Sequence, residues 1–250
     1  MAEPDQPSTA RMIDYWLGGE HHHPVDVAAA GAFEGAYGPC AAIFRALRNF
    51  LGRAVRSIAD AGVDGFLVFG AGVPTRGNVH EVAPDATVLY TDVDPVTIRL
   101  GQRLLADSDR AGYGYGYGDA TDIGTVDPAQ LHRFVPGWGR RPVGVVFLGL
   151  AAFLDDDTLT RTLDELYEAV APGSFLAIDF DSEELAAYPE ALAMMGPAFR
   201  MRAPARFAPL LGRWQPTADG IVPVARWRPA GTPAPVPDAF YGGLATKPAD

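Results

Sequence analysis

The chain has 250 residues, 48% of them hydrophobic, and its 31 acidic and 20 basic residues give a net charge of −11. The hydrophobic share is large enough for a sizeable core, which excludes a wholly disordered chain, and the length favours a single compact unit with additions. The excess of acids argues against binding to a nucleic-acid backbone or an anionic membrane surface, because both attract cationic proteins. We therefore predict neither partner.

Cysteine content and the lack of targeting sequence indicate the compartment. The only cysteine, Cys40, cannot form an intramolecular disulfide, which suits a reducing environment. The first 20 residues contain acids and no apolar stretch typical of a signal peptide, and no window is apolar for the length of a membrane span. We predict a cytoplasmic protein, and leave both a monomer and a homodimer open.

The N-terminal quarter of the chain predicts helices. Ser8 can cap a short helix that ends near Gly18, and a second helix covers about 25–36. A third begins near Pro39 and carries apolar residues at steps of three and four up to Gly62, as helices packed on a core do. We predict that residues 1–62 form a helical lid on a second unit, residues 63–250.

The rest of the chain alternates apolar strands with helices. Strands are predicted at 65–69, 87–91, 143–150 and 174–180, with helices between them. Such a pattern is typical of a parallel sheet covered on both faces, and so of a doubly wound α/β fold. Residues 112–118 alternate glycine and tyrosine, which leaves an edge strand and an ordered loop as alternatives.

Polar and glycine residues follow three of these strands. Gly70-Ala71-Gly72 ends the first, and Asp92 ends the next, 20 residues after Gly72, where a carboxylate can accept hydrogen bonds from both ribose hydroxyls. Asp119 follows the tyrosine-rich segment and could meet an adenine amino group, although plain turn chemistry explains it equally well. No phosphate-binding loop with its lysine is present, so the pattern predicts an adenosine ligand without phosphates.

Six segments resemble an actinobacterial family of S-adenosylmethionine-dependent methyltransferases that was formerly catalogued as a domain of unknown function. The block from Pro74 to Glu81 is the most specific of them. Together the segments span nearly the whole chain, at 7–19, 70–82, 90–95, 171–174, 222–229 and 243–248. The chain is identified as a divergent member of this family.

The resemblance implies a fold, a cofactor and a binding site. The fold is a Rossmann-like seven-stranded methyltransferase sheet with helices on both faces, an N-terminal helical lid and an antiparallel last strand near 242–247. The cofactor is S-adenosyl-L-methionine. The resemblance places the following residues at it: Arg11, Gly70, Ala71, Gly72, Asp92, Asp119, Ala120 and Leu150.

Three positions depart from the family pattern. Val68 stands where the family usually has an acid, two residues before the first glycine of the loop. The run from Glu20 to His23 replaces a lysine-containing segment, and Ala151-Ala152 replaces a Leu-His pair. An acid, a lysine and a histidine are therefore missing from places that could face the cofactor.

Methyl transfer needs alignment of nucleophile, methyl and sulfur, and sometimes the removal of a proton. Histidine is a suitable base near neutral pH, so His21, His22 and His80 are catalytic candidates, together with Tyr15 in the lid. An exposed loop at the histidine run and an orienting role for His80 are the alternatives. Consecutive histidines seldom reach one metal, so no metal site is predicted.

The acceptor site is expected in the segment from Glu183 to Leu211, between the fifth and sixth strands. Its methionines and aromatic residues suit a hydrophobic small molecule, although methionine also fills gaps in ordinary cores. The first functional hypothesis is therefore methyl transfer to a small molecule, in secondary metabolism. Two alternatives stay open: a non-methylating reaction such as cyclisation or elimination, and a regulatory protein that only binds the cofactor.

Overall fold

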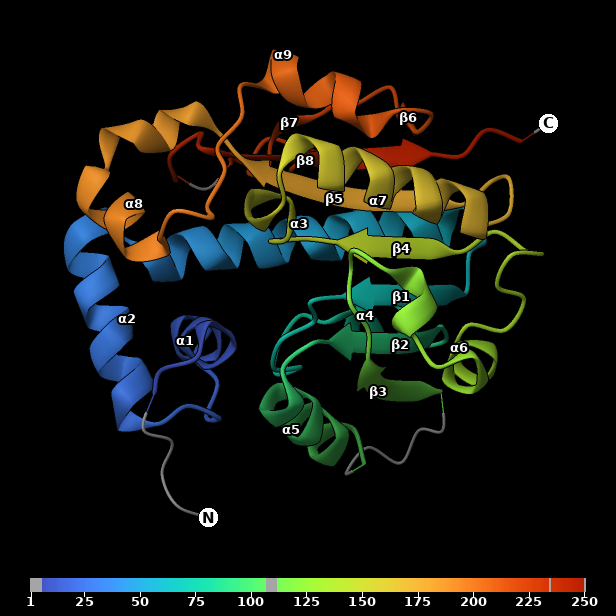
Figure 1. Cartoon of the computed structure of the whole chain (residues 1–250), viewed down its shortest axis with the longest axis horizontal. Coiled ribbons are helices and arrows are strands. Elements are labelled where there is room, and N and C mark those ends of the chain that lie inside the picture. Colours follow the sequence, from blue (N-terminus) through green and yellow to red (C-terminus); the bar gives the residue numbers. More distant parts are fainter. Residues whose placement is uncertain (1–5, 107–111, 234, 250) are drawn as a thin grey trace.

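The computed structural model describes residues 6–106, 112–233 and 235–249. In this part of the chain, eight strands form one sheet in the order β3-β2-β1-β4-β5-β8-β6, with β7 also paired to β8. The first five strands are parallel and β8 is antiparallel to β5. Figure 1 shows the parallel arrows pointing one way and the arrow of β8 the other.

The described strands are β1 (Gly65–Phe69), β2 (Thr87–Asp92), β3 (Tyr113–Tyr117), β4 (Gly144–Phe147), β5 (Phe175–Asp181), β6 (Gln215–Pro216), β7 (Val222–Pro223) and β8 (Phe240–Thr246). The α-helices are α1 (Thr9–Trp16), α2 (Pro24–Tyr37), α3 (Cys40–Asp60), α4 (Val79–Val82), α5 (Pro95–Ala106), α6 (Pro128–Phe134), α7 (Asp156–Ala169), α8 (Pro189–Met195) and α9 (Pro204–Phe207). Short 3-10 helices are η1 (Ile123–Thr125), η2 (Ala151–Phe153), η3 (Glu183–Ala187) and η4 (Ala208–Leu211).

Both faces of the sheet are buried, as its continuous apolar strands predict. Every residue of β1 is buried. On one face α3 packs its apolar stripe, which includes Phe50, Val55 and Ile58, against Phe66. On the other face the core includes the buried leucines of α7, Leu159, Leu163 and Leu166. The expected doubly wound, Rossmann-like sheet with helices on both faces is confirmed.

The tyrosine-rich segment forms the edge strand β3, beside β2. Tyr115 is buried, packs against Tyr90 and donates a hydrogen bond of 2.7 Å to the carbonyl of Gly72. Tyr117 is half exposed. Tyr115 therefore packs within the sheet and supports the loop of residues 70–72 that follows β1.

The far edge of the sheet differs in detail from the seven strands expected. The antiparallel strand β8 begins at Phe240, two residues before the predicted start, and pairs with β5 along its whole length. Along its other side lie two strands of two residues each, β6 and β7. Each of these ends in a proline, Pro216 and Pro223, which cannot donate a ladder hydrogen bond, so the sixth strand is broken into two pieces.

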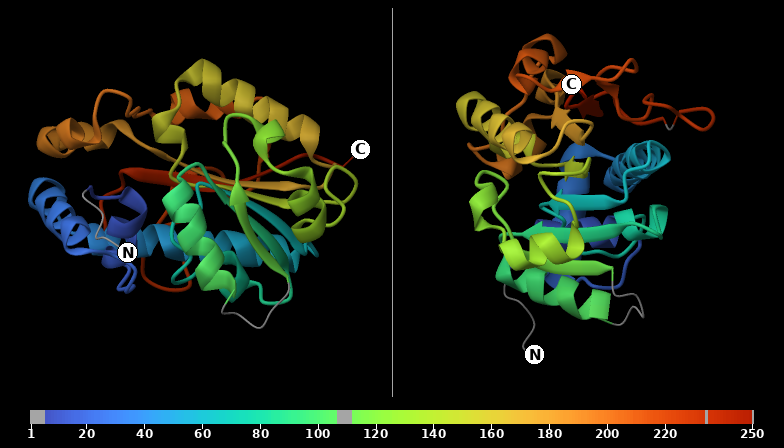
Figure 2. Two further views of the ribbon diagram at one scale, coloured as in Figure 1. Left: turned by 60° about the horizontal axis from the view of Figure 1, so that its bottom comes forward. Right: turned by 90° about the vertical axis from the view of Figure 1, so that its right-hand side faces the viewer.

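Helices α1 and α2 lie at the carboxyl end of the parallel strands, together with α8 from the 183–211 segment (Figures 1 and 2). They share a small core in which Trp16 stacks on Phe44, and Tyr37 of α2 contacts Tyr188 at the start of α8. Helix α3 contributes to the core under the sheet as well. The division of the chain at residue 62 stays a prediction.

None of the described helices is by itself long and apolar enough to cross a membrane. Helices α2 and α3 together reach the required length and composition, but they meet at a bend of 95°.

Candidate functional site

An open cleft of about 940 Å³ lies beyond the carboxyl ends of β1 to β4. Ligands of open α/β sheets bind at this edge, where neighbouring strands lead to opposite faces. The cleft is closed on one side by α1 and the residues before it. Of the residues predicted to bind the cofactor, these line it: Arg11, Gly70, Gly72, Asp92, Asp119, Ala120 and Leu150.

The loop after β1 is shaped by its glycines. Gly70 and Gly72 have φ angles of +55° and +64°, which residues with a Cβ atom rarely adopt. The amide of Ala71 donates to the carbonyl of Thr91 at 2.9 Å, which ties the loop to β2. Ala71 does not line the open cleft and instead lines a smaller cavity behind the loop. The loop therefore exposes backbone to the cleft and is tied to β2.

Asp92 fixes this loop from the end of β2. Its Oδ2 accepts a hydrogen bond from the amide of Gly72 at 3.1 Å, and its Oδ1 accepts one from the amide of Asp94 at 3.0 Å. A carboxylate oxygen has lone pairs to spare after one such bond, so both oxygens can still accept from hydroxyl groups in the cleft. Asp92 is thus placed to bind a ribose and to hold the glycine loop.

Asp119 combines the two roles considered for it. Its Oδ1 accepts from the amide and the hydroxyl of Thr121, both at 2.8 Å, which is the expected turn chemistry. The same side chain lines the cleft, beside Ala120 and opposite Leu150 and α1. Together these residues offer a carboxylate within an apolar setting, which fits an adenine ring.

Arg11 forms a buried ion pair at the base of the lid. Its Nε donates to Oδ2 of Asp26 at 2.7 Å, and Asp26 is fully buried. Asp26 also accepts from the amides of Ser8 and His23, at 2.9 and 2.8 Å. These bonds lower the pKa of Asp26 against the opposing effect of burial, which is the largest single influence. They fasten α1, which walls the cleft, to the start of α2.

A second space, the apolar cavity, adjoins the open cleft and has a volume of about 130 Å³. Its lining residues come mainly from α1, α2, α3, η3 and α8, and from the carboxyl end of β5. The two spaces share four lining residues, Thr9, Ile13, Gly149 and Phe153. The two spaces are therefore neighbours at α1 and at the loop after β4.

Two carboxyl groups of β5, Asp179 and Asp181, lie in the wall of the apolar cavity. Asp179 is 7% exposed, and its Oδ1 accepts from the amide of Gly149 at 2.7 Å. Burial raises the pKa of Asp179 to about 7 and, together with the charge of Asp179, raises that of Asp181 to about 8. Both groups therefore titrate near neutral pH.

The raised pKa values predict how stability depends on pH. The folded protein holds these protons more tightly than the unfolded chain, so the free energy of unfolding falls as pH rises from about 4 to about 8. Asp181→Asn removes one of the two carboxyl groups. A pKa shift of one unit corresponds to about 1.4 kcal/mol, and solvent screening reduces the part of the shift that counts towards stability. We therefore expect the free energy of unfolding of Asp181→Asn to exceed that of the wild type by roughly 1–3 kcal/mol at pH 9.

Urea unfolding at pH 5 and pH 9 measures this effect. The gain in the free energy of unfolding of Asp181→Asn over the wild type should be larger at pH 9 than at pH 5. Glu190→Gln, which changes an exposed carboxylate of α8 outside the cavity, should change the free energy of unfolding little at either pH. Equal pH dependence for Asp181→Asn and the wild type would contradict the assignment.

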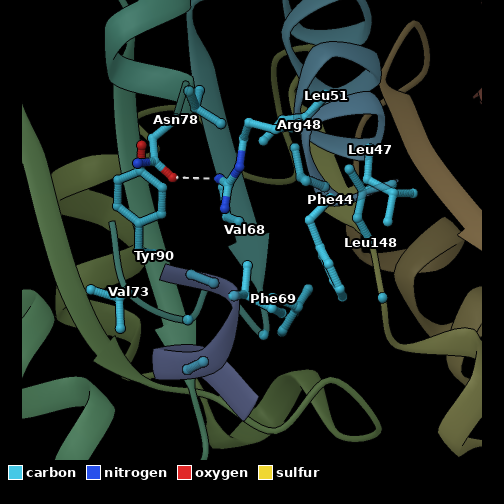
Figure 3. Close-up of a pocket in the computed structure, with 18 of the residues that line it drawn as sticks. Phe44, Leu47, Arg48, Leu51, Val68, Phe69, Val73, Asn78, Tyr90 and Leu148 are labelled. Atoms are coloured by element: carbon cyan, nitrogen blue, oxygen red, sulfur yellow. Dashed lines mark hydrogen bonds between the residues drawn. The ribbon is translucent and has the colours of Figure 1, made fainter. Parts of the chain in front are cut away.

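A third space of about 150 Å³, the loop cavity, lies behind the glycine loop. Figure 3 shows Arg48 reaching into it from α3, next to Val68, with its Nη1 donating to Oδ1 of Asn78 at 2.8 Å. Asp179 also lines this cavity. The position at which the family usually has an acid therefore holds an apolar side chain next to an arginine, and the one carboxyl group among the described lining residues of this cavity comes from β5.

The four catalytic candidates lie outside all three of these spaces. The amide of His21 and Nδ1 of His22 bond to Oδ2 of the buried Asp14, at 2.8 and 3.2 Å, and Tyr15 packs edge-on against His22. His80 bonds to the hydroxyl of Tyr90 through its amide and its Nδ1, at 3.1 and 2.8 Å. Of the four side chains, those of His22 and His80 bond to Asp14 and Tyr90, which fits positioning of α1 and of α4.

Comparison with known proteins decides the family. The model of the S-adenosyl methyltransferase family matches residues 2–248. The chain belongs to this family. The methyltransferase resembles a DUF574 family protein from Streptomyces avermitilis, with 31% identity over 98% of both chains and a TM-score of 0.85. No curated protein matches the sequence significantly.

Further solved structures agree with this assignment. A protein described as a methyltransferase from Thermobifida fusca has 27% identity over 98% of this chain and 96% of its own, with a TM-score of 0.86. Magnesium protoporphyrin IX methyltransferase from Synechocystis, solved with S-adenosylhomocysteine, shares the fold at 11% identity over 94% of this chain and 91% of its own, with a TM-score of 0.60. The methyltransferase uses S-adenosyl-L-methionine as its cofactor.

Sequence reasoning missed the polar groups of the apolar cavity. The signal was an acid within an apolar strand, Asp179, followed by a second at Asp181. Tyr37 could not be singled out from the sequence, because it is the last residue of an ordinary helix, α2. The two alanines that replace the family's Leu-His pair, Ala151 and Ala152, are buried residues of η2 itself.

Proposed function

We propose that this methyltransferase transfers the methyl group of S-adenosyl-L-methionine to a small molecule held in the apolar cavity. The observation that carries the proposal is that the cavity and the open cleft share the wall formed by Gly149 and Phe153. A methyl donor in one space and an acceptor in the other can then approach each other as in-line transfer requires.

In this proposal the cofactor lies along the open cleft. Asp92 accepts hydrogen bonds from its ribose, Asp119 lies beside its adenine, and Gly70 and Gly72 allow close approach of its methionine portion. When bound, S-adenosyl-L-methionine supplies a methyl group on a positively charged sulfur. Asp179 lines both the apolar cavity and the loop cavity. Its carboxylate can supply a negative charge in the loop cavity, where Val68 replaces the acid usual in the family.

The acceptor site draws on the 183–211 segment, as expected for an insertion at this point. Leu185, Leu192, Met195 and Phe199 line the cavity together with lid residues such as Phe33 and Phe44. Met194 is half exposed, and Phe207 belongs to the core of the sheet. The segment thus supports an apolar acceptor through some of its side chains.

Other features of the protein stay predictions. These are a role in secondary metabolism, the cytoplasmic location, the oligomeric state and the absence of nucleic-acid and membrane partners. Catalytic roles for His21, His22, His80 and Tyr15 stay predictions too, and their contacts favour positioning of the lid and of α4.

Transfer of a trideuterated methyl group tests the function. The protein is incubated with labelled S-adenosyl-L-methionine and fractionated small-molecule extracts, and products are followed by mass spectrometry. We expect S-adenosylhomocysteine together with a small molecule that carries the labelled methyl. A changed small molecule without the label would instead support a non-methylating reaction, and label only in macromolecules would contradict the proposal.

A further inference from the structure

The apolar cavity contains an unusual set of polar groups. The partly buried carboxyl group of Asp181 and Oδ2 of Asp179 accept no hydrogen bond within the described part of the chain. The hydroxyl of Tyr37 is buried and unpartnered there too, and this side chain is 8% exposed. Since buried polar groups in proteins are normally paired, these groups lack a partner that a ligand can supply.

The charges around the cavity have one sign. No lysine, arginine or histidine is among its described lining residues. The charge of Asp181 raises the pKa of Tyr37, after the larger effect of burial, and Tyr188 is the other ionisable side chain in the wall. Arg48 lines the loop cavity together with Asp179, but its guanidinium donates to Asn78.

The rest of the cavity wall favours a ligand with an apolar body. It consists of aliphatic and aromatic side chains from α2, α3 and α8, and of Phe153 and Phe240. A volume of about 130 Å³ is close to that of engineered cavities that hold a benzene-sized molecule. The carboxyl groups then decide the charge of the occupant: once they are ionised they repel an anion, a neutral group leaves their charge unbalanced, and a cation balances it.

We propose that the acceptor is an apolar amine, bound as an ammonium ion by Asp179 and Asp181, with Asp181 taking its proton before methyl transfer. The inference rests on the proposed function and names its substrate class. The ammonium gives one proton to the Asp181 carboxylate. The free nitrogen pair then forms the bond to the methyl carbon, the electron pair of the broken carbon–sulfur bond stays on sulfur, and the product is the methylated ammonium.

The empty cavity and the filled one differ in protonation. Without a cation nearby, the carboxyl groups titrate near neutral pH. An ammonium ion favours their ionised forms, so its binding at pH 7 releases protons and its affinity rises as pH increases from 6 to 8.5. A neutral ligand of the same shape has neither property.

Three small probes test the inference: benzylamine, benzyl alcohol and benzoate. Each is titrated calorimetrically into the protein, with and without S-adenosylhomocysteine, in two buffers of different ionisation enthalpy. We expect benzylamine to bind at least about tenfold more tightly than benzyl alcohol at pH 8.5, with proton release at pH 7, and benzoate not to bind. In Asp181→Asn we expect the benzylamine affinity to fall about thirtyfold and proton release to shrink, and in Glu190→Gln both to remain.

Equal affinity for benzylamine and benzyl alcohol, or an unchanged preference in Asp181→Asn, would overturn the inference. If Asp181→Asn remains stably folded at pH 9, its loss of benzylamine binding is not caused by unfolding. Failure of S-adenosylhomocysteine to bind would contradict the proposed function instead, and the titrations without it still decide whether the cavity prefers an amine.

Discussion

Asp92→Asn is expected to weaken the binding of S-adenosylhomocysteine by about tenfold to a hundredfold. In the structure, each carboxylate oxygen accepts one backbone N–H, from Gly72 and from Asp94. An asparagine amide has one acceptor oxygen, so one of these N–H groups would face an NH₂ group and the glycine loop would lose an anchor. Hydrogen bonds to a charged group are worth about 1.5–3 kcal/mol, which corresponds to this range of affinity.

Calorimetric titration of wild type and variant with S-adenosylhomocysteine measures the effect. Asp157→Asn makes the same chemical change on the exposed surface of α7 and should leave the affinity unchanged. An Asp92→Asn protein that is folded and binds with wild-type affinity would exclude Asp92 from the site.

Asp26→Ala is expected to destabilise the protein by about 3–5 kcal/mol, because it leaves the buried Arg11 guanidinium without its partner. Asp26 is fully buried and also accepts from the amides of Ser8 and His23, so three bonds are lost together. The loss falls on the junction of α1 and α2. Since α1 walls the open cleft, binding of S-adenosylhomocysteine should weaken as well.

Urea unfolding gives the change in stability, and amide hydrogen exchange locates it. Exchange in α1 and at the start of α2 should become faster than in β1 and β4. Glu20→Ala removes an exposed acid from the same lid and should have little effect. If Asp26→Ala unfolds with wild-type free energy, the ion pair does not hold the lid.

Much of the fold was predictable because it depends on local patterns. The strands β1, β2 and β5 are mainly apolar, and glycine or an acid stands at or just after their ends, while α3 has a regular apolar stripe. The split of the sixth strand was harder to foresee. It depends on Pro216 and Pro223 in pieces of two residues, too short to show any periodicity.

The cofactor side of the site was also predictable, since Gly70, Gly72 and Asp92 follow strands whose ends meet at one edge. The acceptor side was not. Asp181 and Tyr37 are 144 residues apart in the sequence and line one cavity only because α2 lies near the end of β5 in the fold. Likewise, the environment of Val68 depends on Arg48, a helix residue that lay on the polar side of the stripe and yet points into the loop cavity.

A crystal structure of the protein soaked with S-adenosylhomocysteine tests the central claim, that donor and acceptor meet at the loop after β4. We predict the ribose at Asp92, the adenine beside Asp119, and the sulfur facing Gly149 and the apolar cavity. A sulfur that faces away from this cavity, or a ligand bound outside the open cleft, would contradict the account.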